Sequence, residues 1–152
     1  MGEGYIIRWA RGLARLRTAM DLGDRQIIGV GQELKANATI YKGGFVVTSP
    51  HIGNIRNPPT VAYLEETIEK LTSLTGAKPG IIAHDLHPQF LSTRLAHTLS
   101  EEWGAVLCQV QHHRAHIASV TNEEVVGIAI DGVGYGDDAT IWGGEILTGS
   151  PG

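Results

Sequence analysis

Residues 27–44, IIGVGQELKANATIYKGG, resemble residues 125–145, VVGIAIDGVGYGDDATIWGGE, near the other end of the chain. In both stretches a short apolar run that contains one glycine precedes the triplet Ala-Thr-Ile, which is followed closely by Gly-Gly. Short β-branched runs bounded by glycine are typical of buried strands, so each stretch predicts a strand hairpin. The triplets lie 101 residues apart, and the match indicates an internal repeat, with a chance similarity as the alternative.

The residues between the two stretches alternate between strand and helix patterns. Residues 26–50 contain three short strand patterns separated by turn residues, which predict an antiparallel meander. After Pro58 and Pro59 the apolar residues recur at helical spacing, and Gly76 is expected to cap the end of that helix. Further elements are then expected in this order: a strand at 79–85, a helix at 88–104, a strand at 105–111, a short helix at 112–124, and strands at 125–131 and 139–147.

This order, β-β-β-α-β-α-β-α-β-β, predicts an α/β fold with a mixed sheet flanked by helices. A duplicated lobe that begins with an antiparallel hairpin is the architecture of the actin-like, ribonuclease-H-like ATPases. We therefore expect a basic linker or hinge segment at 1–24, a first lobe at 25–122 and the opening hairpin of a second lobe at 123–152. Because an isolated hairpin is only marginally stable, the second lobe is expected to be truncated.

The composition is that of a globular protein: of 152 residues, 42% are hydrophobic, 18% are charged and 20 are glycine. A chain of this length can bury a genuine core. The formal net charge of −4 gives no general attraction to nucleic acid or to an anionic membrane. Five of the 12 Lys and Arg residues lie in the first 25 positions, where they predict a solvated linker or docking arm rather than a nucleic-acid patch: Arg8, Arg11, Arg15, Arg17 and Arg25.

The cysteine content and the hydropathy of the chain indicate in which cellular compartment the protein resides. No apolar run approaches the ~20 residues of a membrane span, and the N-terminal residues contain no apolar signal-peptide region. The single cysteine, Cys108, excludes an internal disulfide. These features predict a cytoplasmic protein without membrane association. Since Cys108 lies within an apolar strand pattern, we expect a buried structural thiol rather than a nucleophile.

Three of the seven histidines lie in the segment QHHRAH, directly after an apolar run. His112 and His116 are spaced i, i+4, which places both on one face of a helix with Cβ atoms ~5–6 Å apart, whereas His113 points elsewhere. Two such imidazoles can share a Zn or Fe ion, and Asp131, between a strand and a glycine loop, is the natural third ligand. A cluster of surface polar residues is the alternative. The motif lacks the glutamate of the zincins, which disfavours a protease.

The glycine loop DGVGYGDD offers backbone N–H groups at Gly132, Gly134 and Gly136 that can bind a phosphate. Its two further aspartates would oppose a bare anion, so an intervening cation would help. A plain hairpin turn is the alternative for this loop. Lys35, in the turn of the first hairpin, is expected either to meet phosphate charge or to be solvated.

Asp85, His87 and Arg94 lie where the strand at 79–85 gives way to a helix. Residues at this edge of an α/β sheet often contact the ligand. Capping of the helix is the alternative, and the sequence does not decide between the two.

Four segments can be taken together, in this order and spacing: VGQELKANATI (30–40), DLHPQFLSTRLA (85–96), VQHHRAHIAS (110–119) and DGVGYGDDATIWGGE (131–145). They resemble the HypF carbamoyltransferase family of nickel–iron hydrogenase maturation, in which such segments have matching order and spacing. The departures from the family pattern are small: Arg114 stands where a histidine is frequent, Val133 where threonine is usual and Ala139 where glycine is usual.

The resemblance implies a function as part of a larger protein. Family members make carbamoyl adenylate from carbamoyl phosphate and ATP, and transfer the carbamoyl group to the C-terminal cysteine of the partner HypE. The transfer takes place in a final actin-like domain, whose metal ligands match His112, His116 and Asp131, with a further aspartate far downstream. The chain resembles the first part of that domain, so on its own it is expected to be inactive.

Two other functions remain possible at this point. The related tRNA threonylcarbamoyl-transfer enzymes share the HxxxH motif and the fold, although this chain shows no basic surface for tRNA. A non-catalytic metal- or nucleotide-binding remnant is the other alternative, because half of a site can bind without turnover.

Overall fold

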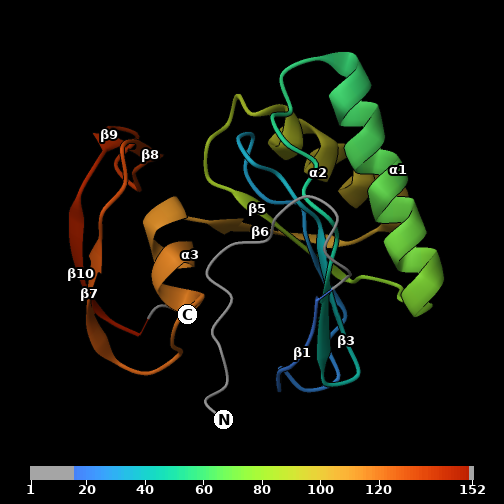
Figure 1. Ribbon diagram of the computed structural model, residues 1–152, viewed down its shortest axis with the longest axis horizontal. Coiled ribbons are helices and arrows are strands. Elements are labelled where there is room, and N and C mark those ends of the chain that lie inside the picture. The colour runs from blue at the N-terminus through green and yellow to red at the C-terminus, as the bar shows by residue number, and fades with distance from the viewer. Residues whose placement is uncertain (1–15, 151–152) are drawn as a thin grey trace, which may run out of the picture.

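The computed structural model describes residues 16–150 (Figure 1). Its centre is a mixed sheet in the order β1-β4-β3-β2-β5-β6. The expected meander is formed by β2, β3 and β4, and β5 and β6 continue the sheet in parallel with β2. The six strands are β1 (Leu16–Ala19), β2 (Ile27–Gly29), β3 (Thr39–Lys42), β4 (Phe45–Thr48), β5 (Ile81–Asp85) and β6 (Val106–Val110).

The segment expected to be a basic linker contains a strand that the sequence analysis missed. Residues 1–15 lie outside the described residues, but β1 pairs antiparallel with β4, from Leu16 opposite Thr48 to Ala19 opposite Phe45. The expectation of an irregular segment is therefore wrong for residues 16–19. The short sequence LRTA has too little alternation to predict a strand, and it forms one because β4 offers a free backbone edge.

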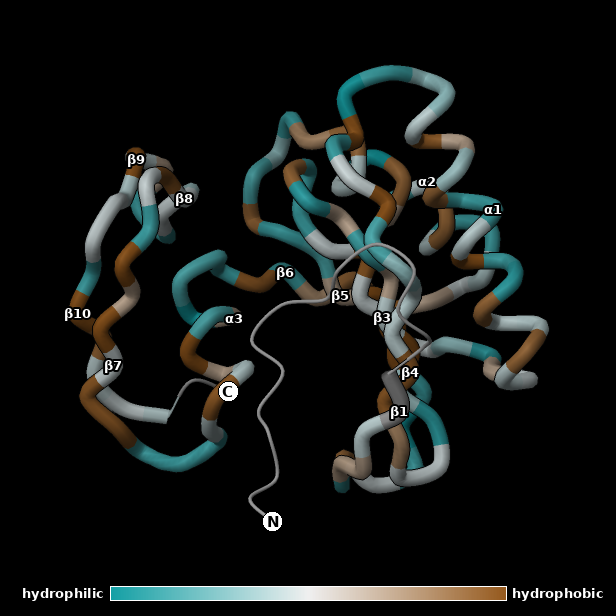
Figure 2. Tube along the Cα trace, viewed as in Figure 1, coloured by the Kyte–Doolittle hydropathy of each residue, from teal (hydrophilic) through white to brown (hydrophobic). Residues whose placement is uncertain are grey.

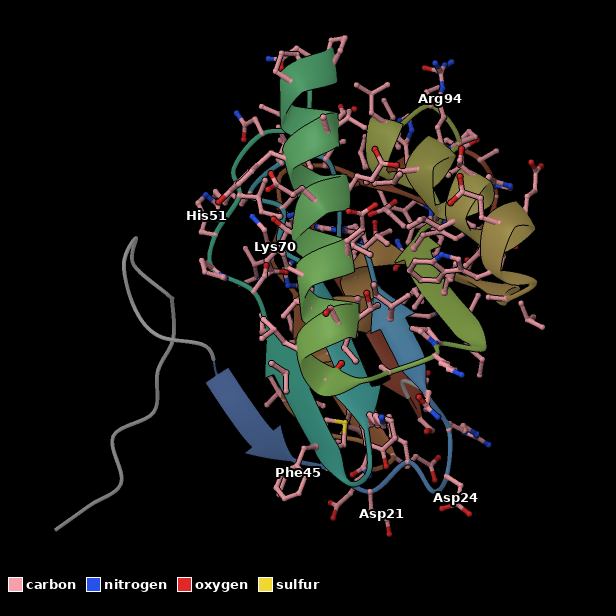
Figure 3. All side chains as sticks on the ribbon, turned by 90° about the vertical axis from the view of Figure 1, so that its right-hand side faces the viewer. Asp21, Asp24, Phe45, His51, Lys70 and Arg94 are labelled. Atoms are coloured by element: carbon pink, nitrogen blue, oxygen red, sulfur yellow. The ribbon has the colours of Figure 1, made fainter. Side chains whose placement is uncertain are left out.

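Two helices, α1 (Pro58–Thr75) and α2 (Leu91–Trp103), lie on one side of the sheet, and Figure 3 shows α1 across its front. No helix among residues 16–150 is long and apolar enough to cross a membrane.

Burial of aliphatic side chains stabilises this arrangement, and fully burying one of them contributes roughly 1.5–3 kcal/mol to the free energy of folding. The largest fully buried apolar side chains come from the sheet, the residue directly after β2, α1 and the loop before α1: Ile28, Val30, Ile40, Ile55, Leu64, Ile68 and Ile82.

Both helices end at the glycines that the sequence singled out. Gly76 and Gly104 follow α1 and α2 with φ angles of 59° and 64°, in the left-handed region that favours glycine. At the start of α1, the Asn57 side chain accepts a hydrogen bond from the Thr60 N–H at 3.1 Å, and Thr60 Oγ1 accepts one from the Asn57 N–H at 3.4 Å. The expected helix ends are confirmed.

The exposed edge of the sheet at β6 overturns one expectation. Cys108 is exposed, not buried. Val106, on the same face of the strand, is 68% exposed, whereas Leu107 on the other face packs against the core. An apolar strand pattern does not reveal which strand will lie at an edge, or that helices will cover only one of its faces.

A third helix and a separate ribbon follow β6. Helix α3 (His112–Ala118) is shorter than expected, since it ends at Ser119. β7 (Val125–Ala129) pairs antiparallel with β10 (Glu145–Gly149). Between them, β8 (Gly134–Tyr135) pairs with β9 (Ile141–Trp142). The strand expected at 139–147 is thus divided by Gly-Gly, and only its later part pairs with β7.

Helix α3 lies between the six-stranded sheet and the two-stranded ribbon that β7 forms with β10, here called the β7–β10 ribbon (Figure 1). It packs on the inner face of the ribbon, where a Cβ at Gly127 would lie 2.3 Å from Cδ1 of Ile117, so glycine permits the close approach. The outer face carries Val126, Ile128 and Ile146, which are 69%, 67% and 69% exposed. Figure 2 shows hydrophobic segments along this ribbon as well as in the central sheet.

Candidate functional site

Three chain segments bring polar side chains to the space around α3. Strand β5 ends at Asp85, β6 leads into α3, whose first residue is His112, and β7 is followed closely by Asp131. Because β5 and β6 are parallel neighbours, with Asp85 in register with Val110, their carboxyl ends lie at the same edge of the sheet. Ligands of open α/β folds bind at such an edge.

The candidate metal ligands His112, His116 and Asp131 converge in the structure. Nε2 of His112 lies 2.7 Å from Oδ2 of Asp131, and Nε2 of His116 lies 3.6 Å from the same oxygen. The two Nε2 atoms are 3.2 Å apart. Each residue thus offers one ligand atom, and these atoms all lie within 4.8 Å of one another. The structure brings together the three residues that the sequence singled out as ligands.

This donor set fits a divalent cation. Zn and Fe both accept imidazole and carboxylate ligands, and tetrahedral ligands with bonds of ~2.0–2.1 Å lie about 3.3 Å from one another. The observed separations of 2.7, 3.2 and 3.6 Å lie on either side of that value. In a tetrahedral site, three protein ligands would leave one coordination position for a further donor.

The N-cap of α2 is Phe90, so the alternative of helix capping is wrong for Asp85, and its contact with a ligand stays a prediction. Oδ1 of Asp85 accepts a hydrogen bond from the His87 N–H at 2.8 Å, which closes the turn after β5. Its Oδ2 lies 3.4 Å from Nδ1 of His112, the nitrogen that points away from the other candidate ligands. No spacing in the sequence indicates this contact, because it depends on how α3 is placed beside the sheet.

The electrostatics of the site follow from these contacts. The pKa of His112 is raised above its ordinary value of 6.5, chiefly by hydrogen bonding with Asp85, while burial opposes the increase and Asp131 adds to it. Burial pushes the pKa of Asp131 upward, but the N–H of Gly132 and both histidines more than reverse this, so the pKa is lowered. These contacts favour the protonated form of His112 beside an ionised carboxylate, and a cation at Nε2 would displace only the proton on that nitrogen.

His113 is fully buried, so the alternative of a surface cluster is wrong for this histidine. Its Nδ1 lies 3.0 Å from Nε2 of Gln111, and that amide nitrogen also donates to the backbone carbonyl of Tyr135 at 3.1 Å. A Cβ at Gly134 would lie 2.5 Å from the His113 ring. Gln111 and His113 thus fasten α3 to the loop that follows Asp131. The sequence did not predict this fastening role of Gln111 and His113. The only signal for it was that both are polar residues beside the candidate ligand His112.

The three glycines expected to bind phosphate have separate surroundings. The N–H of Gly132 donates to the side chain of Asp131 at 2.7 Å and so orients a candidate ligand. Gly134 packs against His113, and a Cβ at Gly136 would lie 2.2 Å from Trp142, so both allow close packing within the loop. Phosphate binding by these glycines stays a prediction.

Two cavities adjoin the candidate ligands. One, of about 500 Å³, lies beside β7 and is bordered by His116 and Asp131. The other cavity, of about 370 Å³, lies toward the sheet, and its lining includes Gly29, Gly31, Gln32, Ala83, His112 and His116.

Lys35 is exposed in the loop between β2 and β3 and borders neither cavity, so its contact with phosphate also stays a prediction.

His87 and Arg94 differ in their position relative to this site. The His87 ring stacks on Phe90, with centroids 4.1 Å apart, and lies 5.0 Å from the ring of Tyr135 in β8. Arg94 is exposed, and Figure 3 shows it projecting outward from α2. The structure therefore brings His87 toward the glycine loop and leaves Arg94 apart.

Two protein-family models match this chain. The model described as the HypF Kae1-like domain matches residues 23–123, which is most of the chain. The chain belongs to the HypF Kae1-like domain family. A second model, the second subdomain of the carbamoyltransferase Kae1-like domain, matches residues 127–152. The expected relationship to HypF is confirmed.

The curated relatives of this HypF-family chain are named carbamoyltransferases. It is 38% identical over 147 residues to carbamoyltransferase HypF2 of Cupriavidus necator, which covers 93% of the chain and 18% of the relative. It is 36% identical over 151 residues to carbamoyltransferase HypF of Rhizobium leguminosarum bv. viciae, covering 96% of the chain and 19% of the relative. The chain thus spans less than a fifth of the length of these two relatives.

Solved structures of HypF confirm the fold. HypF from T. kodakarensis aligns with a TM-score of 0.86 and 38% identity, over 94% of this chain and 19% of that one. A full-length HypF in its phosphate- and nucleotide-bound form aligns with a TM-score of 0.77 and 39% identity, over 83% and 20%. YeaZ from Pseudomonas aeruginosa, with a TM-score of 0.53 and 13% identity over 84% and 68%, shares the fold alone. The expected actin-like, ribonuclease-H-like α/β architecture is confirmed.

Proposed function

We propose that this chain forms part of the transfer domain of a cytoplasmic HypF-type carbamoyltransferase. In this proposal, His112, His116 and Asp131 hold a divalent Zn or Fe ion. The observation that carries the proposal is the convergence of their three ligand atoms within 4.8 Å. The relatives that bear the name carbamoyltransferase support the reaction class.

The proposed donor is carbamoyl adenylate, made from carbamoyl phosphate and ATP, and the acceptor is the C-terminal cysteine of a HypE-like protein. The thiolate sulfur bonds to the carbamoyl carbon, the bond from that carbon to the phosphate oxygen breaks, and AMP leaves with the electron pair. When bound, the cation would supply Lewis acidity for the phosphate. The nucleotide-bound form of a full-length relative supports a nucleotide site in this fold.

The chain's own residues would bind and orient the reactants. His112, His116 and Asp131 supply two neutral donors and one negative charge, which suits a site that must also accept an anionic phosphate. The cavity of about 370 Å³ beside the two histidines gives room for part of a nucleotide. Holding the reacting groups together in one geometry is the main contribution that such residues make to acyl transfer.

One pair of substitutions tests this function. His112→Ala removes one of the three candidate ligands, so Zn²⁺ affinity of the full chain should fall by at least roughly tenfold. In a HypF-type protein that contains this chain, the same change should prevent the gain of one carbamoyl mass by the C-terminal peptide of the partner. The readouts are competition with a chromogenic chelator and mass spectrometry after incubation with carbamoyl phosphate and ATP.

His97→Ala is the matched control, because His97 is an exposed histidine on α2 and is not one of the candidate ligands. It should leave both Zn²⁺ affinity and carbamoyl transfer unchanged. Equal losses from the two substitutions would indicate nonspecific binding of zinc by histidine, and full transfer by the His112 variant would contradict the proposed site.

A further inference from the structure

All three candidate ligands belong to one packed unit, formed by α3 and the first part of the ribbon. Arg114 of α3 pairs with Asp137 at 2.9 Å, in addition to the close packing of α3 on Gly127 and Gly134. Within residues 16–150, the six-stranded sheet contributes no atom to the convergent ligand set. The spacing of the ligands is therefore set mainly by the contacts of α3 with the ribbon.

Asp85 reaches this unit from the six-stranded sheet. It ends β5, which has a paired strand on each side, and its side chain is only 6% exposed. The turn after it is anchored by Thr93, whose Oγ1 donates to the backbone oxygens of Asp85 and His87 at 3.3 and 2.9 Å. The carboxylate is thus held on a rigid element, with Oδ2 at 3.4 Å from Nδ1 of His112.

The ring of His112 has a carboxylate near each nitrogen, Asp85 at Nδ1 and Asp131 at Nε2. A neutral imidazole carries its proton on one nitrogen, and the partner of the other nitrogen decides which one. A carboxylate at Nδ1 keeps the proton there, so Nε2 presents its lone pair to an ion that Asp131 and His116 also bind. Such carboxylate–histidine pairs fix both the tautomer and the orientation of the ring.

We propose that Asp85 is a positioning residue, which holds His112 with its proton on Nδ1 and its Nε2 directed at the metal position. The proposal rests on the metal-binding function proposed above and adds to it a residue that supplies no ligand atom. It also gives the six-stranded sheet a direct influence on a site whose ligands lie outside it.

Binding of Co²⁺ to the full chain, followed by its visible absorption, tests this role. Asp85→Ala should weaken Co²⁺ binding by about ten- to a hundredfold, the usual effect of removing the partner of a ligating histidine. Asp85→Asn keeps an oxygen that accepts from Nδ1–H and should recover part of the loss. Thr98→Val is the control, because Thr98 is exposed on α2 and its hydroxyl donates to the Arg94 carbonyl of the same helix, and it should bind Co²⁺ as the wild type does.

A ¹⁵N spectrum of the histidines in the zinc-loaded chain separates positioning from general stabilisation. Wild type and Thr98→Val should show His112 protonated at Nδ1, whereas Asp85→Ala should lose this signal to exchange with water. Wild-type Co²⁺ affinity in Asp85→Ala, or an equal loss in Thr98→Val, would overturn the role of Asp85 and leave the metal site standing. Wild-type binding that does not depend on His112 would overturn the metal function and this role together.

Discussion

The two stretches that resemble each other in sequence differ in the burial of their corresponding aliphatic side chains. In the first, Ile28 and Ile40 are fully buried. Their counterparts in the second, Val126 and Ile141, are 69% and 78% exposed. The residue types and the strand patterns are nearly the same, so the difference comes from what covers each stretch.

The first stretch is covered by α1 and α2, whereas the outer face of the β7–β10 ribbon has no helix against it among the described residues (Figure 2). Both stretches nevertheless present a glycine toward α3. Gly29 borders the cavity beside His112 and His116, and Gly127 packs against Ile117. The shared feature of the two stretches is thus the small residue on the α3 side, and the difference lies on the opposite face.

The largest expected effect comes from truncating the isoleucine of each Ala-Thr-Ile triplet. Ile40→Ala should reduce the free energy of unfolding by about 2–5 kcal/mol, because it leaves a cavity in the core. Ile141→Ala should change it by no more than about 0.5 kcal/mol, because the side chain is exposed. Urea unfolding followed by circular dichroism measures both. Similar losses from the two substitutions would show that Ile141 is buried in solution and would remove the contrast.

An intermediate effect is expected from adding a methyl group to the two glycines on the α3 side. Gly127→Ala should destabilise the chain by about 1–3 kcal/mol, since the side chain of Ile117 must move to admit the new atom. It should also weaken Zn²⁺ binding, because α3 carries His112 and His116. Gly29→Ala is the matched change, and no atom lies within 4 Å of its added Cβ.

The Gly29 variant should keep both the stability and the Zn²⁺ affinity of the wild type, measured by the same unfolding and competition assays. A loss of Zn²⁺ affinity in the Gly29 variant alone would mean that the ligands depend on the sheet side more than on the ribbon side.

The elements that local pattern controls were predicted, and those that depend on neighbours were not. The helix ends at Gly76 and Gly104 follow from residues close in sequence, as does the i, i+4 spacing of His112 and His116. The exposure of Cys108 depends on β6 being an edge strand. Strand β1 likewise depends on the free edge of β4, which lies far away in the sequence.

The candidate site divides in the same way. Asp131 was identified because it lies at a strand end before a glycine loop, which is a local signal. Asp85 and His113 were not assigned their roles, because these depend on the direction in which α3 crosses between the sheet and the ribbon. A helical spacing shows which side chains share a face, and it does not show what each face will meet.

The smallest expected effect concerns the two carboxylates at His112, one from each region. Asp85 is the main cause of the raised pKa of His112, and Asp131 is the lesser cause. In the metal-free chain, Asp85→Asn should therefore lower the pKa of His112 more than Asp131→Asn does. NMR titration of the ring protons measures both changes. The pKa of His112 in the folded state lies above its ordinary value of 6.5. The stabilisation that protonated His112 gains from its carboxylates is therefore complete below pH 6.5, and it is lost as pH rises through the folded-state pKa. The stability difference between wild type and Asp85→Asn should therefore shrink over this interval. A difference that stays constant would mean that Asp85 acts only through the turn at His87.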